Sequence, residues 1–202
     1  MILCDIGNTS YHFLDKDRSY KEDVNLFNPN SITKKIYYIC VNHKVKLVLD
    51  KLDNWIDLSE NIDMKNYYDS MGVDRIFACE AIKNGVIVDA GSAVTVDVVK
   101  DGIFDGGFIY PGKKAMSDCY KGISSVLDYE FNFSLDLKKL PKNSQDSITY
   151  GYLKNLHTEV ESYNLPIYLT GGDSCEFTKI FPNATIDEML IFKGMKKIIE
   201  TI

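Results

Sequence analysis

The sequence lacks the cysteine pairs, histidine clusters and long apolar runs that define several common protein classes. Its five cysteines are widely separated and none lies in a Cys-x-x-Cys pair, so we expect neither a disulfide framework nor a zinc site. The three histidines have no metal-ligand spacing. No apolar run reaches the ~18 residues of a membrane span, and no basic-then-apolar signal segment is present. We therefore expect a cytoplasmic protein with buried, reduced thiols and no membrane contact.

Positive charge is also scarce. The 202 residues include 23 Lys and Arg against 29 Asp and Glu, which gives a formal net charge of −6. Nucleic-acid binding requires a basic surface, so this balance argues against a nucleic-acid partner. Hydrophobic residues make up 45% and charged residues 26% of the chain, as in an ordinary globular protein. The length suits one compact unit or two small lobes.

Two similar acidic segments are the most informative feature that is present. Asp5-Ile6-Gly7-Asn8-Thr9 and Asp89-Ala90-Gly91-Ser92-Ala93 each follow a short apolar run and precede strand-like sequence. This pattern predicts a hairpin with a carboxylate at its mouth. We expect the two glycines to adopt backbone conformations closed to other residues and to let a ligand approach. Such turns can bind phosphate through backbone N–H groups, while the aspartate binds a metal ion.

The order of predicted elements suggests an internal duplication. We expect strands at 1–5, 11–14, 24–27, 36–41, 55–56, 86–89, 94–100, 106–110 and 166–170. We expect helices at 45–52, 74–83, 113–127, 144–163 and 190–202. A turn at Asn28 could cap a short helix through Lys35. Asn84-Gly85 should end the helix that begins at residue 74, and residues 100–102 should form a hairpin turn. The two acidic turns lie 84 positions apart (89 − 5). The chain should therefore form two α/β lobes with a cleft between them.

Gly72-Val73-Asp74-Arg75 admits two interpretations. Asp74 could simply stabilise a helix N-terminus, with Arg75 exposed to solvent. Alternatively, Asp74 could accept a proton from a substrate hydroxyl while the Arg75 guanidinium holds a substrate carboxylate. The residues alone leave both open.

Two glycine-rich segments resemble nucleotide loops less closely. The segment 107–113 matches the first seven positions of a Walker A loop, but the eighth is Lys114 instead of Ser or Thr, and Pro111 removes an N–H group. We reject the P-loop interpretation. The segment 170–174 predicts either a strand-to-helix turn with Asp173 or Ser174 as N-cap, or a flat glycine surface for an adenine ring.

Four segments together resemble the type III pantothenate kinases, in the acetate-kinase, sugar-kinase, Hsp70 and actin superfamily. They are residues 5–9, 72–75, 89–97 and 106–112, in the family's order. The resemblance implies an α/β fold of two ribonuclease H-like lobes, as in actin-like ATPases, related by duplication and separated by a cleft. We expect the N-terminal lobe at 1–73 and the C-terminal lobe, with helical additions, at 74–202.

The resemblance also implies ATP-dependent phosphorylation of pantothenate, the first step of coenzyme A synthesis, with Mg²⁺ and a homodimer. Asp74 would be the catalytic base, and Asp89 would bind a monovalent cation, K⁺ or NH₄⁺. The residues implied for ATP are Asp5, Ile6, Gly7, Asn8, Thr9, Ser10, Tyr11, His12 and Ser92. Those implied for pantothenate are Tyr68, Gly72, Val73, Asp74, Arg75 and Ser144. Tyr67 could replace Tyr68, and serine stands at 92 and 144 where threonine is usual.

Two other functions remain as alternatives. The first is another small-molecule kinase of the same superfamily, although a neutral sugar would not need the arginine of the Gly-x-Asp-Arg segment. The second is a non-catalytic nucleotide-binding regulator, for example an accessory factor in transcription. Such a regulator would lack one of the acidic residues, yet Asp5, Asp74 and Asp89 are all present.

Overall fold

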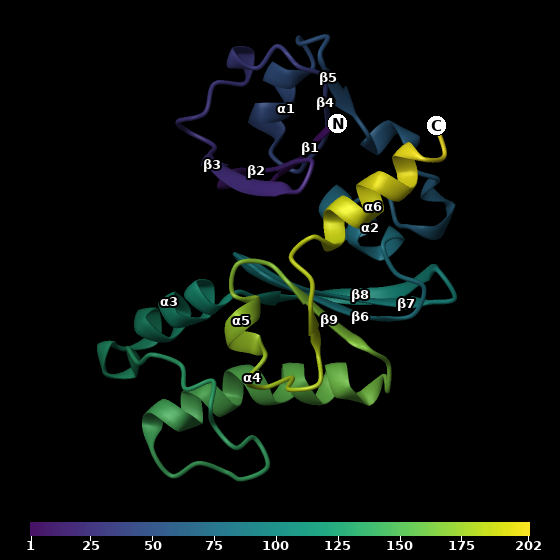
Figure 1. The fold of residues 1–202 in the computed structure, drawn as a ribbon. Coiled ribbons are helices and arrows are strands. Elements are labelled where there is room, and N and C mark those ends of the chain that lie inside the picture. Colours follow the sequence, from purple (N-terminus) through teal and green to yellow (C-terminus); the bar gives the residue numbers. More distant parts are fainter. The chain divides into compact units, whose positions relative to one another are not determined.

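The computed structural model describes residues 1–202 and contains two five-stranded sheets (Figure 1). The chain divides into two compact units. The first comprises residues 1–82 together with 189–202, and the second comprises residues 83–188. No helix combines the length and the apolar composition that a membrane span requires.

The first sheet has the strand order β3-β2-β1-β4-β5. The central strand β1 pairs antiparallel with β2 and parallel with β4. The strands are β1 (Ile2–Ile6), β2 (Ser10–Asp15), β3 (Arg18–Asp23), β4 (Ile36–Cys40) and β5 (Trp55–Asp57). Since side chains alternate along a strand, each face of this sheet has its own apolar cluster.

Helices cover the two faces of the first sheet. On one face Phe13, Tyr38 and Trp55 pack with Leu49 of α1 (His43–Leu49). On the other face Leu3 and Ile39 pack against helices α2 (Val73–Glu80) and α6 (Leu190–Ile199). The two helices lie side by side in Figure 1, so the C-terminal residues complete the core of the N-terminal unit.

The second sheet has the order β10-β9-β6-β7-β8. Its strands are β6 (Gly85–Ala90), β7 (Ala93–Lys100), β8 (Ile103–Pro111), β9 (Ile167–Thr170) and β10 (Thr185–Ile186). Helices α3 (Lys113–Ile123), α4 (Ser144–Ser162) and α5 (Ser174–Phe177) belong to this unit. The valines of β6 and β7 pack with α4 and α5 in one apolar cluster, and α4 runs along the sheet in Figure 1.

The two sheets have the same topology. In each, the central strand pairs antiparallel with the strand that follows it and parallel with the fourth strand of the unit. The remaining pairs, β2 with β3, β7 with β8, β4 with β5 and β9 with β10, match in direction as well. The duplication predicted from the acidic turns is therefore confirmed.

Several predicted elements differ in the structure. The third strand is β3 at 18–23, and residues 24–27 form a turn whose Val24 and Phe27 pack on the core. The prediction followed apolar content, but β3 is an exposed edge strand. The helix after Asn28 ends at Ser31, and residues 125–127 form a separate 3₁₀ turn after α3. Helix α2 ends at Glu80, and Gly85 begins β6.

The contact-defined units also differ from the lobes expected at 1–73 and 74–202. Residues 74–82 and 189–202 belong to the first unit, because α2 and α6 pack on each other and on the first sheet. The hairpin turn at Asp101-Gly102 is confirmed, with both residues in the left-handed region at φ 53° and 79°.

We predict that Gly194→Ala destabilises the protein, because a Cβ at position 194 would collide with the backbone carbonyl of Phe77. Helix α6 would have to move off α2, and overpacking of this kind costs about 1–3 kcal/mol. The measurement is urea unfolding. Gly122→Ala in α3 is the control, since nothing lies within 4 Å of its Cβ position and alanine favours a helix. Equal stability of the two variants would contradict the prediction.

Candidate functional site

The first acidic turn joins β1 to β2 and is held by backbone hydrogen bonds. The Gly7 N–H donates to the Ser10 carbonyl at 3.0 Å, and the Thr9 carbonyl accepts from the Val24 N–H at 3.0 Å. Asn8 and Thr9 are exposed at the tip, and their N–H groups donate to no backbone carbonyl. The tip therefore offers N–H donors and short polar side chains to an anion.

Other residues assigned to the first turn by resemblance have side chains that point elsewhere. Ile6 and Tyr11 lie in the apolar core. His12 shares a 2.7 Å hydrogen bond with the Ser19 hydroxyl, and its ring packs against Phe192. Burial, with a smaller effect from Lys21, lowers the pKa of His12 to about 4. The imidazole is therefore neutral at neutral pH and offers no positive charge to a phosphate.

The second acidic turn joins β6 to β7 and is one residue shorter. Asp5 lies opposite His12 in the first hairpin, whereas Asp89 lies opposite Thr95 in the second. On its other side Asp89 lies opposite Thr170 of β9. Thr95 and Asp97 share one face of β7, because Asp97 lies opposite Ile87, two residues before Asp89.

Glycines with distinct roles surround the second turn. A Cβ at Gly112 would collide with the carbonyls of Gly91 and Ser92, and one at Gly171 would collide with Asp89 and lie 2.5 Å from the Ala90 carbonyl. Gly171 also has φ +87°, in the left-handed region. The residue before α3 and the residue after β9 are thus packed directly against the turn.

Gly7 and Gly91 do not have the backbone conformation that the sequence predicts for them. Neither has a positive φ, so the prediction of an unusual backbone conformation is wrong. A Cβ would meet no atom closer than 3.8 Å at Gly7 or 3.6 Å at Gly91. The chain's own conformation and packing therefore do not require glycine at either position, and space beside each turn remains open to a ligand.

Asp74 lies in the first turn of α2 and folds back over the helix N-terminus. Its Oδ1 accepts a hydrogen bond from the Arg75 N–H at 2.8 Å. A Cβ at Gly72 would lie only 2.6 Å from this oxygen, so the glycine makes room for the carboxylate. Burial raises the pKa of Asp74, although the hydrogen bond and the charge of Arg75 oppose the shift. A carboxylate with a raised pKa is a better proton acceptor.

The structure distinguishes the two candidate tyrosines. The buried Arg75 donates from Nη1 to the Tyr68 hydroxyl at 2.6 Å, and its guanidinium lies 5.9 Å from the Tyr68 ring centroid. The Tyr67 hydroxyl instead bonds Glu80 at 2.9 Å. Tyr68 is therefore the tyrosine beside Arg75 and Asp74. Ser144 is exposed at the start of α4 in the second unit.

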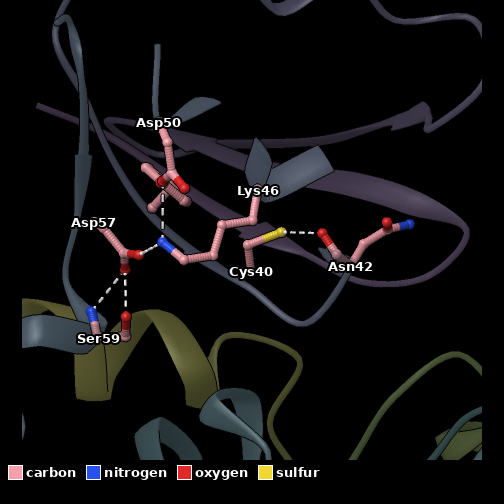
Figure 2. A network of polar contacts seen from close by, with 7 residues as sticks. Cys40, Asn42, Lys46, Asp50, Asp57 and Ser59 are labelled. Atoms are coloured by element: carbon pink, nitrogen blue, oxygen red, sulfur yellow. Dashed lines mark hydrogen bonds and ion pairs between the residues drawn. The ribbon is translucent and has the colours of Figure 1, made fainter. Parts of the chain in front are cut away.

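A polar network fixes α1 over the first sheet (Figure 2). Lys46 of α1 bonds Asp50 at 3.1 Å and Asp57, the last residue of β5, at 2.5 Å, while Asp57 also accepts from Ser59. Burial acts to lower the pKa of Lys46, but the hydrogen bonds to the two carboxylates outweigh it and raise the pKa. Burial raises the pKa of the nearby Cys40 thiol to about 11, which makes it a poor nucleophile. We interpret this network as structural.

A pocket of about 410 Å³ borders the first turn within the first unit. Its lining consists of Asn8, Tyr11, Val24, Asn25, Phe27, Pro29, Asn42, Lys44, Val45 and Val48. The volume falls in the range of small-molecule sites. No motif in the sequence predicts this pocket, because its lining comes from three separate segments of the chain. Among all residues, no group of three or more His, Cys, Asp or Glu side chains forms a metal site.

The fold and the acidic turns define the general class of protein. The two sheets form an α/β fold built from two units of the same topology. A Sinorhizobium meliloti protein described as a putative 2-dehydro-3-deoxygalactonokinase is 10% identical, with a TM-score of 0.57 over 100% of this chain and 96% of that one, which supports the fold alone.

Sequence comparison gives the particular family. Residues 41–164 match the family model of type III pantothenate kinase. Curated type III pantothenate kinases of Sulfurimonas denitrificans and Helicobacter hepaticus are 62% and 42% identical, each over 99% of this chain and 98% of the relative. The chain therefore belongs to the type III pantothenate kinase family.

A solved relative carries a different description. A Campylobacter jejuni protein called a conserved putative Baf family transcriptional activator is 37% identical, with a TM-score of 0.88 over 100% of this chain and 98% of that one. A curated C. jejuni relative, 39% identical, is named type III pantothenate kinase.

We predict that Asp74→Asn stabilises the folded protein at pH 7–8. Because burial raises the pKa of Asp74, the folded state favours the protonated carboxyl. Ionisation therefore costs stability as the pH rises through the raised pKa. Asparagine keeps an acceptor for the Arg75 N–H and cannot ionise.

The measurement is thermal unfolding of both proteins from pH 4 to 8. The gain in Tm should shrink as the pH falls toward the ordinary carboxyl range of about 3.9. An Asp74→Asn protein that is less stable than the parent at pH 7–8 would contradict the prediction.

Proposed function

We propose that this protein transfers the γ-phosphoryl group of ATP to the hydroxyl of pantothenate, which is the first step of coenzyme A synthesis. The observation that carries the proposal is the half-buried Asp74 carboxylate, with its raised pKa, next to the Arg75–Tyr68 pair, in a chain that belongs to the type III pantothenate kinase family. The proposed compartment is the cytoplasm, which suits five free cysteines.

Asp74 would act as the general base. Phosphoryl transfer depends mainly on positioning and charge neutralisation, so the base accepts the hydroxyl proton as the bond to phosphorus forms. The raised pKa of Asp74 moves it toward the physiological range. Its fixed position over the α2 N-terminus, with Gly72 beneath it, means that little reorganisation is needed on binding.

Arg75 and Tyr68 would bind the pantothenate carboxylate. A guanidinium is suited to bidentate carboxylate binding, and the bond from Arg75 to the Tyr68 hydroxyl holds both side chains in place. Gly72 and Val73 would contribute backbone contacts. Ser144 is proposed as a further hydroxyl contact from the second unit, where the family usually has threonine.

The two acidic turns would bind the triphosphate of ATP. Asn8 and Thr9 would supply N–H groups, and Thr9, Ser10 and Ser92 would supply hydroxyls. Ile6, Gly7, Tyr11 and His12 would contribute to the turn through their backbone. Asp5 is a half-buried carboxylate at the end of β1. It is of the donor type that Mg²⁺ takes in small number beside phosphates and waters. When bound, Mg²⁺ supplies neutralisation of phosphate charge.

Asp89 is the proposed ligand of a monovalent cation, K⁺ or NH₄⁺. The local chemistry fits such an ion, because Asp89 lies between Thr95 and Thr170 on neighbouring strands. The Thr95 hydroxyl oxygen is buried and has no hydrogen-bond partner. Oxygen donors of this kind are the ones that hard cations take.

A transcriptional regulator is the alternative raised by the description of the C. jejuni relative. The net charge of −6 disfavours direct contact with a nucleic acid. A non-catalytic protein also has no need for a carboxylate with a raised pKa, such as Asp74. Pantothenate-dependent turnover separates the two functions.

The test is a coupled assay of ADP release with and without pantothenate. We expect ADP release to depend on pantothenate, and Asp74→Asn to lower kcat by ~10²–10⁴-fold, the usual contribution of a general base. Asp69→Asn is the matched control, because Asp69 is exposed and lies five residues earlier. ADP release independent of pantothenate, or a near-normal kcat of Asp74→Asn, would refute the assignment.

The active form is proposed to be a homodimer that uses the α3 region as its interface. Helix α3 has no buried residue. Ile123, Val126 and Leu140, in and after α3, are 68%, 71% and 78% exposed. Exposed apolar side chains are the kind that an interaction surface covers. A second copy is the occupant that the family resemblance implies.

We predict that the protein sediments as a dimer at micromolar concentration and that Val126→Asp shifts it toward monomer. A buried, unpaired carboxylate at the interface would be costly. Leu26→Asp is the control, since Leu26 is 85% exposed in the first unit. Sedimentation velocity that shows a monomeric parent protein, or equal effects of both substitutions, would rule out this interface.

A further inference from the structure

The hydroxyl of Thr95, which fits the chemistry of the proposed cation site, has no assigned role in the proposed function. Its Oγ1 is buried from solvent and has no hydrogen-bond partner. A buried hydroxyl without a partner loses its interaction with water and gains nothing in return. An unsatisfied group of this kind in a native fold calls for an explanation, such as an ion that completes its environment.

The position of Thr95 indicates what kind of ligand completes the environment of its hydroxyl. Thr95, Asp89 and Thr170 stand directly opposite one another on β7, β6 and β9, so their side chains share one face of the sheet. Thr170 is 4% exposed, and Asp97, two residues beyond Thr95 on the same face, is 1% exposed. The row therefore brings a carboxylate and two hydroxyl oxygens together at the carboxyl ends of β6 and β9.

The backbone holds the carboxylate in this row. The Asp89 Oδ1 packs so closely on Gly171 that a Cβ there would collide with it. The Asp173 N–H donates to the Ala90 carbonyl at 2.9 Å, which ties the segment after β9 to the end of β6. A fixed carboxylate next to an unsatisfied hydroxyl is a preformed set of oxygen ligands.

We propose that Thr95 is a ligand of the monovalent cation, with its Oγ1 coordinating the ion that Asp89 binds. The proposal rests on the proposed function for the identity of the ion, and on the buried Thr95 oxygen for the added ligand. A neutral hydroxyl suits this role, because its oxygen lone pairs coordinate the ion without a second negative charge. The hydroxyl then determines affinity for the ion and takes no part in proton transfer.

The test measures ion binding through stability, without reference to catalysis. Thermal unfolding of the full chain is followed in KCl, NH₄Cl, NaCl or MgCl₂, with choline chloride holding the ionic strength constant, both without nucleotide and with ADP. An ion that binds the folded state raises Tm with a saturable dose dependence. The variants are Thr95→Val, which removes only the hydroxyl, Thr95→Ser, which keeps it, and Thr158→Val at an exposed position of α4 as control.

We expect KCl or NH₄Cl to raise the Tm of the parent, Thr95→Ser and Thr158→Val proteins. Thr95→Val should raise the half-saturating concentration at least tenfold. In choline alone, Thr95→Val should have a higher Tm than the parent, because the unsatisfied hydroxyl is gone. Asp89→Asn should also lose the response.

Three results would overturn the proposal. The first is an unchanged half-saturating concentration in Thr95→Val. The second is a Thr95→Val protein that is less stable than the parent in choline, since the hydroxyl would then have a protein partner. The third is a response of the parent to MgCl₂ alone. Pantothenate-dependent ADP release, measured separately on the parent protein, shows whether the proposed function fails independently.

Discussion

The structure depends on the central strand of each sheet, which is hydrogen-bonded on both sides and has an aspartate as its second-last residue. β1 and β6 each pair antiparallel with the strand that follows and parallel with a strand from much later in the unit. In each sheet, the parallel pairing brings the carboxyl ends of the central strand and its parallel partner to one edge. Ligands bind at such an edge in open α/β sheets. The positions of Asp5 and Asp89 follow from this pairing.

Much of the fold could be predicted from the sequence because the central strands are apolar and the helices have one apolar face. β1, β4, β6, β7 and β9 were predicted on that basis and are present. β3 and β10 were not predicted, for different reasons. Five of the six residues of β3 are exposed, so its sequence resembles that of a polar loop. β10 has only two residues, which is too short for a strand pattern to show. Edge strands bury little, so burial leaves a weak pattern in them.

The site was predictable at the level of residue type and unpredictable at the level of contacts. The motifs singled out Asp74 and Arg75 as candidates, but not that Tyr68 bonds the arginine while Tyr67 bonds Glu80. In an irregular segment, tertiary packing decides which partner each side chain contacts, and such packing leaves no periodic pattern in the sequence. His12 is a similar case, because the neighbour that makes its site apolar, Phe192, lies at the far end of the chain.

The two acidic turns occupy equivalent positions in the two sheets but are packed differently against the rest of the chain. The second turn is packed against Gly112 and Gly171, where no other residue fits without displacing backbone. The first turn has no such contact at Gly7 and is tied to its surroundings through the Thr9 carbonyl and the Ile6 carbonyl, which accept from Val24 and Val41 at 3.0 Å each. A closely packed turn keeps its carboxylate in one place, as a fixed ion site requires. A turn without such close backbone contacts can adjust to a phosphate group, so the duplicated element suits the two tasks proposed for it.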